Sequence, residues 1–261
     1  MRRSYVGRLL HVGVATVALI GVFPHAMAQG DGLRVPLPSA DLAALESLLG
    51  PGVVGKPIPA FPIPSAAATP SAKRLTYRLT SGPDAKASVT VEMSRVDAEA
   101  NGRKWRYAIG TRQLGFLNVT PGERLGFASL QDNSQGILTR FNPAEPLIVA
   151  GMNAGDEQTL TSAIAVYDLG NEDTVQHTGT LALKFSYVGA YQVRVPAGTY
   201  RAALLKWSIS GKVGAASIQD IQYRLVTADG LIVAAVDHRD IAAMLLYSND
   251  TQTGRVLLVR P

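Results

Sequence analysis

The chain has 261 residues, no cysteine, four histidines, and 25 Lys and Arg against 20 Asp and Glu. Without thiols it forms no disulfide, cysteine-linked lipid anchor, thiolate zinc site or iron–sulfur cluster, so its stability must come from a hydrophobic core. A transition-metal site would depend on carboxylates, and we expect no metal and no other cofactor.

The first 28 residues have the pattern of an export signal. Three arginines precede an apolar run over 12–23, and Ala26-Met27-Ala28 follows as a small-x-small cleavage site. The run is shorter than the ~20 residues that a spanning helix needs. We therefore expect cleavage after Ala28 and a periplasmic protein that does not span the membrane. Because Arg2 and Arg3 are adjacent, the sequence leaves Sec and twin-arginine export open.

Removal of the signal changes the charge balance. The signal contains three of the basic residues and no acidic one, so 22 basic and 20 acidic residues remain. Such a balance gives no support to nucleic-acid binding, which depends on neutralising phosphates. Residues 73–112 nevertheless hold nine basic and four acidic residues, and 141–200 hold six acidic and two basic ones. Charge of this kind is typical of a solvated face, and it also steers anionic partners.

A short helix and a proline-rich segment come next. Residues 39–49 carry leucines at helical spacing, with Ser39 as a capping residue, Asp41 at the start and Gly50 as the stop. Residues 51–72 contain six prolines. Proline fixes φ and lacks an amide hydrogen, so we expect an extended linker or arm over 51–72, which together with the short helix makes up the segment 29–72.

From Lys73 onward the hydrophobic period changes to two. Apolar residues alternate with polar ones over 73–79, 89–93 and 105–109, and Asn101-Gly102 predicts a hairpin turn. Further candidate strands are 111–118, 123–130, 136–141, 147–152, 159–168, 175–188, 199–210, 218–227, 231–237, 241–247 (either a strand or a helical turn) and 255–260. This pattern predicts a single all-β domain over 73–261, an antiparallel β-sandwich or a partly open β-barrel. An outer-membrane barrel is disfavoured by short strands and 7% aromatic residues.

The stretch Val195-Pro196-Ala197-Gly198-Thr199 predicts a tight hairpin turn. Proline suits the second position of a type I turn, and glycine suits a left-handed position after it. We expect Val195 to lie across from Thr199, with a bulge at Gly198. An anion cradle made by the same amides is the alternative.

The same residues carry a family resemblance. Val195 to Tyr200, followed by a strand and by Ala228-Asp229-Gly230-Leu231-Ile232, resembles exported bacterial all-β domains of unknown function with a V-P-A-G-T-[FY] corner. The resemblance covers about 193–237, and the aromatic residue often found shortly before the glycine is absent here. That family has no established reaction, so the resemblance implies a turn and no functional residue.

Candidates for catalysis are few. His238 lies in Asp237-His238-Arg239-Asp240, the densest ionisable cluster, and a carboxylate can orient an imidazole as a general base. Adjacent residues of a strand, however, point to opposite faces, which favours a charged hairpin end. His177 lies in a strong strand pattern and reads as a core or edge residue. No nucleotide-binding loop, nucleophile elbow or zinc-protease motif occurs.

Three functions remain open. The first is a non-catalytic module that binds an apolar or amphiphilic ligand, such as a lipid, inside the β domain. The second is an assembly module that docks onto an envelope protein, and the third is a hydrolase built on His238 and Asp237. Oligomeric state stays undetermined. The first predicts an apolar pocket of roughly 300 Å³ or more, lined from both halves of the chain. The binding candidates are the inward aromatic residues Trp105, Tyr107, Phe185 and Trp207.

Overall fold

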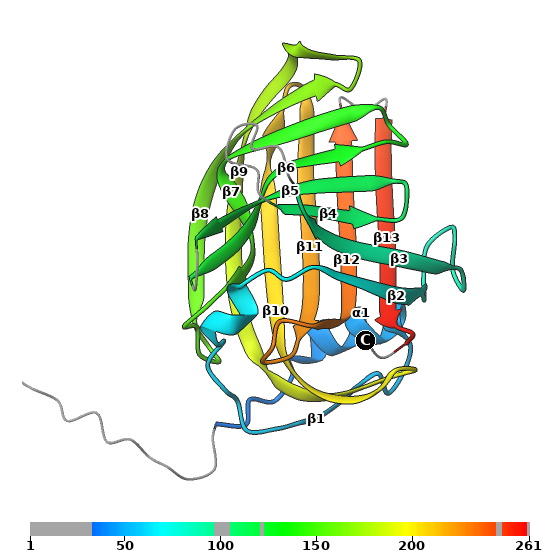
Figure 1. The fold of residues 1–261 in the computed structure, drawn as a ribbon, viewed down its shortest axis with the longest axis vertical. Coiled ribbons are helices and arrows are strands. Elements are labelled where there is room, and N and C mark those ends of the chain that lie inside the picture. The colour runs from blue at the N-terminus through cyan, green and yellow to red at the C-terminus, as the bar shows by residue number, and fades with distance from the viewer. Residues whose placement is uncertain (1–32, 97–104, 121–122, 244–246, 260–261) are drawn as a thin grey trace, which may run out of the picture. The chain divides into compact units, whose positions relative to one another are not determined.

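The computed structural model describes residues 33–96, 105–120, 123–243 and 247–259 (Figure 1). All of them belong to one unit, Asp31–Pro261. The predicted export signal over 1–28 and the predicted Asn101-Gly102 turn lie outside these described residues.

The described residues form thirteen strands, one α-helix and one short 3₁₀-helix. The helices are α1 (Ser39–Leu49) and η1 (Ser65–Ala68). The strands are β1 (Val54–Pro57), β2 (Lys73–Leu79), β3 (Ser88–Arg95), β4 (Trp105–Ile109), β5 (Gln113–Thr120), β6 (Arg124–Asp132), β7 (Ile137–Val149), β8 (Glu157–Asp168), β9 (Asn171–Val195), β10 (Gly198–Val213), β11 (Ala216–Val226), β12 (Ile232–Ala243) and β13 (Tyr247–Leu257).

Strands β2 to β13 close into an antiparallel barrel. Each strand pairs with the next one along the chain, and β13 pairs with β2, so that the ring has no open edge among these strands. Figure 1 shows β13 and β2 side by side. The predicted all-β class is confirmed, and of the two predicted architectures the barrel is the one that forms. Strand β1 adds to the end of β9, where Val54 pairs with Val193.

Two strands each join a pair of predicted strands. Strand β7 joins most of the predicted strand 136–141 to the start of 147–152, and β12 joins 231–237 to the first residues of 241–247, the segment that the sequence left open between a strand and a helical turn. Pro143 in the middle of β7 follows a cis peptide bond at Asn142, and the register of β6 and β7 shifts nearby. Proline cannot donate to the ladder, which is why it stands at such an irregularity.

The hairpin turn at Pro196 and Ala197 forms, with Gly198 at φ 134°. The predicted register is wrong by one residue, because Val195 lies across from Gly198 and not from Thr199. The register shifts by one residue at a bulge on β9, where Leu204 pairs with Gly189 and Leu205 pairs with Tyr187. A bulge inserts one extra residue into one strand, which restores the pairing of the inward faces beyond it.

Helix α1 packs on the outer face of the barrel. Its buried Asp41 accepts hydrogen bonds from Lys206 Nζ at 2.7 Å and Tyr223 Oη at 2.8 Å, and both of those residues alternate with inward-facing ones. Gly254 lies so close to the helix that an added Cβ would be 2.2 Å from the Leu48 carbonyl oxygen. The helix begins at Ser39, but its N-cap position is Pro38, so the predicted Ser39 cap is wrong. Gly50 ends it as expected.

The proline-rich segment runs along one end of the barrel, which we call the basal end. The turns at 195–198 and 226–232 lie at this end, as does the start of β2. Ile63 exchanges two main-chain hydrogen bonds with Gly151 and Met152, and the Tyr187 hydroxyl donates to the Phe61 carbonyl. In η1, Ala67 and Ala68 are buried. The segment is extended, as expected for its proline content, and it closes the basal end.

Candidate functional site

A small apolar cavity lies inside the basal end, beneath η1. We call it the basal cavity. It is lined by Ala67, Thr69, Pro70, Lys73, Leu75, Tyr77, Val91, Met93, Tyr107, Leu125, Leu147, Ile148, Gly230 and Ile232. These residues come from both halves of the chain, as the binding hypothesis requires. The enclosed space is only about 20 Å³, far below the roughly 300 Å³ expected from the sequence.

Lys73 is the charged residue of this lining. It is the first residue of β2, and its Nζ donates a hydrogen bond of 3.3 Å to the Gly230 carbonyl oxygen. Burial lowers the pKa of Lys73, and the negative charge of Asp229 opposes this effect. The Asp229 carboxylate itself accepts a hydrogen bond from the Thr227 hydroxyl. Lys73 is thus a partly buried ammonium with two of its three hydrogens unused by the described residues.

Two tyrosines, Tyr77 and Tyr107, also line the basal cavity. Tyr77 Oη donates a hydrogen bond of 2.6 Å to the Ile232 carbonyl, and burial raises the pKa of this phenol. The Tyr107 ring contacts Phe127 edge-on, with 5.7 Å between ring centres. Both phenols lie close enough to Arg255 to influence its pKa. The basal cavity therefore adjoins a second, polar group of interior residues.

That polar group, the lumenal cluster, consists of six ionisable residues from four strands: Glu145, Asp220, Arg224, Asp237, Arg239 and Arg255. Two members share the face of Leu205 and Ile209, because Arg224 pairs with Leu205 and Asp220 with Ile209 across the β10–β11 ladder. Trp207 Nε1 donates to the Pro146 carbonyl on β7 at 2.6 Å, which places this face inside the barrel.

Asp237 is the centre of the lumenal cluster. Arg224 Nη2 lies 2.5 Å and Arg255 Nη1 3.2 Å from its two carboxylate oxygens. Burial alone would raise the pKa of Asp237, but the two guanidinium groups outweigh burial and hold the pKa below its ordinary value. Beside it, Asp220 accepts hydrogen bonds from Arg239 Nε at 3.2 Å and Gln222 Nε2 at 2.9 Å.

Some buried polar atoms of the lumenal cluster lack hydrogen bonds to the described residues. The second oxygen of Asp220 and the Nε of Arg255 are buried and have no hydrogen-bond partner among the described residues. Glu145 faces the cluster from β7, and burial together with the charge of Asp220 raises its pKa to about 7. A carboxyl group that titrates near neutrality is suited to proton transfer.

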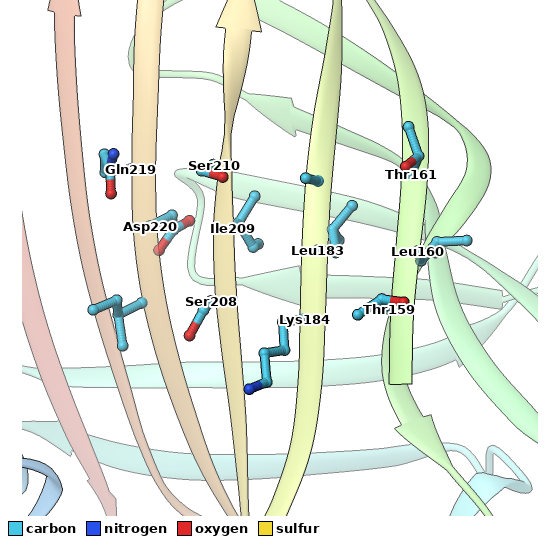
Figure 2. A pocket seen from close by; sticks show the side chains of 12 residues that line it. Thr159, Leu160, Thr161, Leu183, Lys184, Ser208, Ile209, Ser210, Gln219 and Asp220 are labelled. Atoms are coloured by element: carbon cyan, nitrogen blue, oxygen red, sulfur yellow. The ribbon is translucent and has the colours of Figure 1, made fainter. Parts of the chain in front are cut away.

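A shallow depression of about 440 Å³ lies on the outer face of β8 to β11 (Figure 2). Two rows of outward residues border it: Thr159, Lys184, Ser208 and Ile221 in one row, and Thr161, Ala182, Ser210 and Gln219 in the other. Figure 2 shows the labelled members of each row on either side of Leu160, Leu183, Ile209 and Asp220. The depression is open to solvent and has a mixed lining from 159–221, so it lacks the apolar, two-sided lining expected of the predicted pocket.

The sequence-derived binding candidates are inward residues of the barrel. Phe185 and Trp207 are buried and their rings are 4.8 Å apart, so they pack against each other. Trp105 is partly buried against the same core. Tyr107 is the member of this set that lines the basal cavity.

The catalytic candidates do not converge. Asp237 faces the lumenal cluster, whereas His238 is on the outer face, with Nε2 3.2 Å from the Asp250 carboxylate. Their side chains therefore lie on opposite sides of the barrel wall. His177 is exposed near the start of β9. Sequence reasoning did not single out Lys73 or Glu145. The sole signal for either is a charged residue next to an apolar alternating run.

These observations define a class of protein: a closed twelve-stranded antiparallel barrel with a capped cavity at one end and an ionised cluster in its interior. None of the helices in the described part of the chain has the length and apolar character needed to cross a membrane. No family model and no curated protein matches the sequence.

Three solved structures are similar in part. The hypothetical lipoprotein YmcC from Escherichia coli is 11% identical, with a TM-score of 0.39 over 75% of this chain and 87% of that one. A candidate exported protein with a YmcC-like fold from Bacteroides fragilis is 14% identical, with a TM-score of 0.41 over 77% and 98%. A candidate lipoprotein from Parabacteroides distasonis is 12% identical, with a TM-score of 0.34 over 71% and 93%.

Proposed function

We propose that the protein is an exported, non-catalytic β-barrel that binds a single-chain amphiphile of the cell envelope in its basal cavity. The observation that carries this proposal is the lining of the cavity, in which apolar side chains from both halves of the chain surround one ammonium group, that of Lys73. Apolar walls with few polar groups are typical of small-molecule sites. Export is supported by the charged, apolar and small-x-small pattern of residues 1–28.

A binding role fits the residues better than hydrolysis does. The described lining of the basal cavity contains an amine, two phenols and the hydroxyl residue Thr69, but no carboxylate and no imidazole. Asp237 and His238, the pair on which a hydrolase would depend, lie on opposite sides of the wall. The ring of strands is closed, so it offers no free strand edge to another protein among the described strands β2 to β13. The proline-rich segment packs on the barrel itself, which disfavours its use as a docking arm.

Entry of a ligand requires η1 to move. The present space of about 20 Å³ holds one water molecule at most. The methyl groups of Ala67 and Ala68 in η1 are buried, and Ala67 lines the cavity. Two buried methyls contribute about 1.6 kcal/mol at ~0.8 kcal/mol each, whereas every methylene of an entering chain contributes a similar ~0.8 kcal/mol. An acyl chain therefore offsets the loss of η1 contacts within a few methylenes.

The test uses the delipidated protein and a fluorescent fatty-acid probe. Saturable binding with one site per chain is expected. Ala68→Gly removes a buried methyl and loosens η1 by about 1–2 kcal/mol, so the association rate should rise roughly 5- to 30-fold. Ala66→Gly is the matched control, because Ala66 lies in the same 3₁₀-helix but is exposed. Absence of saturable binding, or equal rates for the two variants, would rule out entry at the basal end.

A further inference from the structure

We propose that the basal cavity selects amphiphiles with a negatively charged head group, and that the Lys73 ammonium binds that head. This inference rests on the proposed function and adds the chemical class of its ligand. The shared chemistry is an anionic oxygen group on a single acyl or alkyl chain, whether carboxylate or phosphate.

The first argument is the incomplete environment of the Lys73 ammonium. It has three hydrogens to donate, and within the described residues it makes one hydrogen bond, to the neutral carbonyl of Gly230. Asp229 acts on it through charge alone, without an ion-pair contact among those residues. Burying a cation without a paired anion is unfavourable. An anionic head group of a ligand would supply the missing negative charge, and its oxygen atoms would accept hydrogen bonds from the two remaining ammonium hydrogens.

The second argument is the order of polarity along β2. Lys73, Leu75 and Tyr77 are successive inward residues that begin at the basal end. The Lys73 ammonium therefore lies at the end of this row, beside Gly230 and η1, and the apolar side chains of the lining lie to one side of it. An amphiphile that enters head-last would place its chain among Leu75, Val91 and Leu125 and its head beside Lys73. A ligand without charge would leave the ammonium without an anion.

The pH dependence of binding follows from the same geometry. The groups that act on Lys73 are the surrounding apolar residues, which lower its pKa, and Asp229, which raises it. A bound anion favours the ammonium form. Affinity for an anionic amphiphile should therefore be highest below the lowered pKa of Lys73 and fall as the pH rises through it, while affinity for a neutral one should stay constant.

The experiment compares hexadecanoate, hexadecyl phosphate and hexadecanol as competitors of the fluorescent probe. The wild-type protein should bind one or both anions about 10- to 100-fold more tightly than hexadecanol, the range expected for a charge-assisted hydrogen bond. Lys73→Met should lose this preference while retaining hexadecanol binding, and Lys73→Arg should keep most of it. Lys56→Met is the control, because Lys56 is an exposed lysine of β1. The ratio between the two anions identifies the head group as carboxylate or phosphate.

Each outcome separates the two proposals. If none of the three competitors binds, the proposed function itself is wrong. If all three bind equally, or if Lys73→Met retains the preference for anions, the cavity binds amphiphiles but Lys73 does not select their head. Should Lys73→Met fail to fold, the same decision rests on Lys73→Arg and on the pH profile of the wild-type protein.

Discussion

Replacing Glu145 by glutamine should stabilise the barrel at neutral and alkaline pH. Glu145 faces Asp220 and Asp237 as well as Arg224 and Arg239, and burial and Asp220 raise its pKa from 4.5 to about 7. Ionising a carboxyl group with a raised pKa is unfavourable in the folded state. The folded chain therefore holds a proton that the unfolded chain releases between about pH 4.5 and 7, and stability falls with rising pH in this window.

The magnitude follows from the shift. The rise of the pKa from 4.5 to about 7, at ~1.36 kcal/mol per pKa unit, gives an upper limit of about 3.4 kcal/mol, and access of water to this partly exposed side chain lowers the expected value to about 1–2 kcal/mol. Glu145→Gln should thus match the wild type near pH 4.5 and exceed its free energy of unfolding by about 1–2 kcal/mol at pH 8.

Urea unfolding, followed by tryptophan fluorescence between pH 4.5 and 8, measures this difference. Glu157→Gln is the matched control, because Glu157 is an exposed carboxylate whose pKa is lowered by its hydrogen bond to Lys184. The control should gain no stability at pH 8. A Glu145→Gln protein that is no more stable than the wild type at pH 8, or whose advantage is the same at pH 4.5, would show that Glu145 does not titrate against the lumenal cluster.

Two further predictions concern α1 and the outer wall. Gly254→Ala should destabilise the protein by about 1–3 kcal/mol, because its Cβ would lie 2.2 Å from the Leu48 carbonyl oxygen and would push α1 off the barrel. Gly170→Ala, where no atom lies within 4 Å, should leave the unfolding midpoint within experimental error; equal effects of the two changes would contradict the contact. His238→Ala should change the free energy of unfolding by less than about 0.5 kcal/mol and leave probe binding intact, as for a surface residue. Loss of any measured hydrolytic activity in that variant would revive the catalytic hypothesis.

The alternation of apolar residues predicts the class of the fold because the inner face of a barrel must be filled. In β9, Leu181, Leu183, Phe185 and Tyr187 are buried as their spacing indicates. Closure is different. The pairing of β13 with β2 joins segments about 180 residues apart and involves three residue pairs. Local pattern contains no information on such a pairing, so sandwich and barrel could not be separated.

The lumenal cluster could not be predicted, because in β11 the charged residues face inward and the apolar residues face outward. In β11, Ile221, Tyr223 and Leu225 alternate with Asp220 and Arg224, and alternation alone would place the apolar set inside. The structure places the charged set inside, where it meets Asp237 and Glu145 from other strands. The apolar set is outside, and Tyr223 and Leu225 are buried there because α1 covers that face. A pattern of period two fixes which residues share a face, and only tertiary packing decides which face is inner.

The sequence also could not predict that η1 caps the barrel. Ala67 and Ala68 lie between prolines in a segment whose composition is typical of a linker. Their burial depends on the shape of the barrel end, with the Ala67 carbonyl 2.8 Å from where a Cβ on Gly230 would lie. Lys73 gains its partly buried position from the same contact. Neither residue carries a local signal for it.

The docking of α1 ties the order of folding to the last strands of the barrel. Asp41 and its partner Tyr223 are 182 residues apart in sequence, and the outer apolar face that α1 covers is built by β10 to β13. Contacts between residues so far apart in sequence form late, because the entropy cost of closing the long loop between them arises before the contacts stabilise the chain. Until β13 is in place, both the leucine face of α1 and the outer face of β11 are uncovered, and each is a surface on which chains can associate.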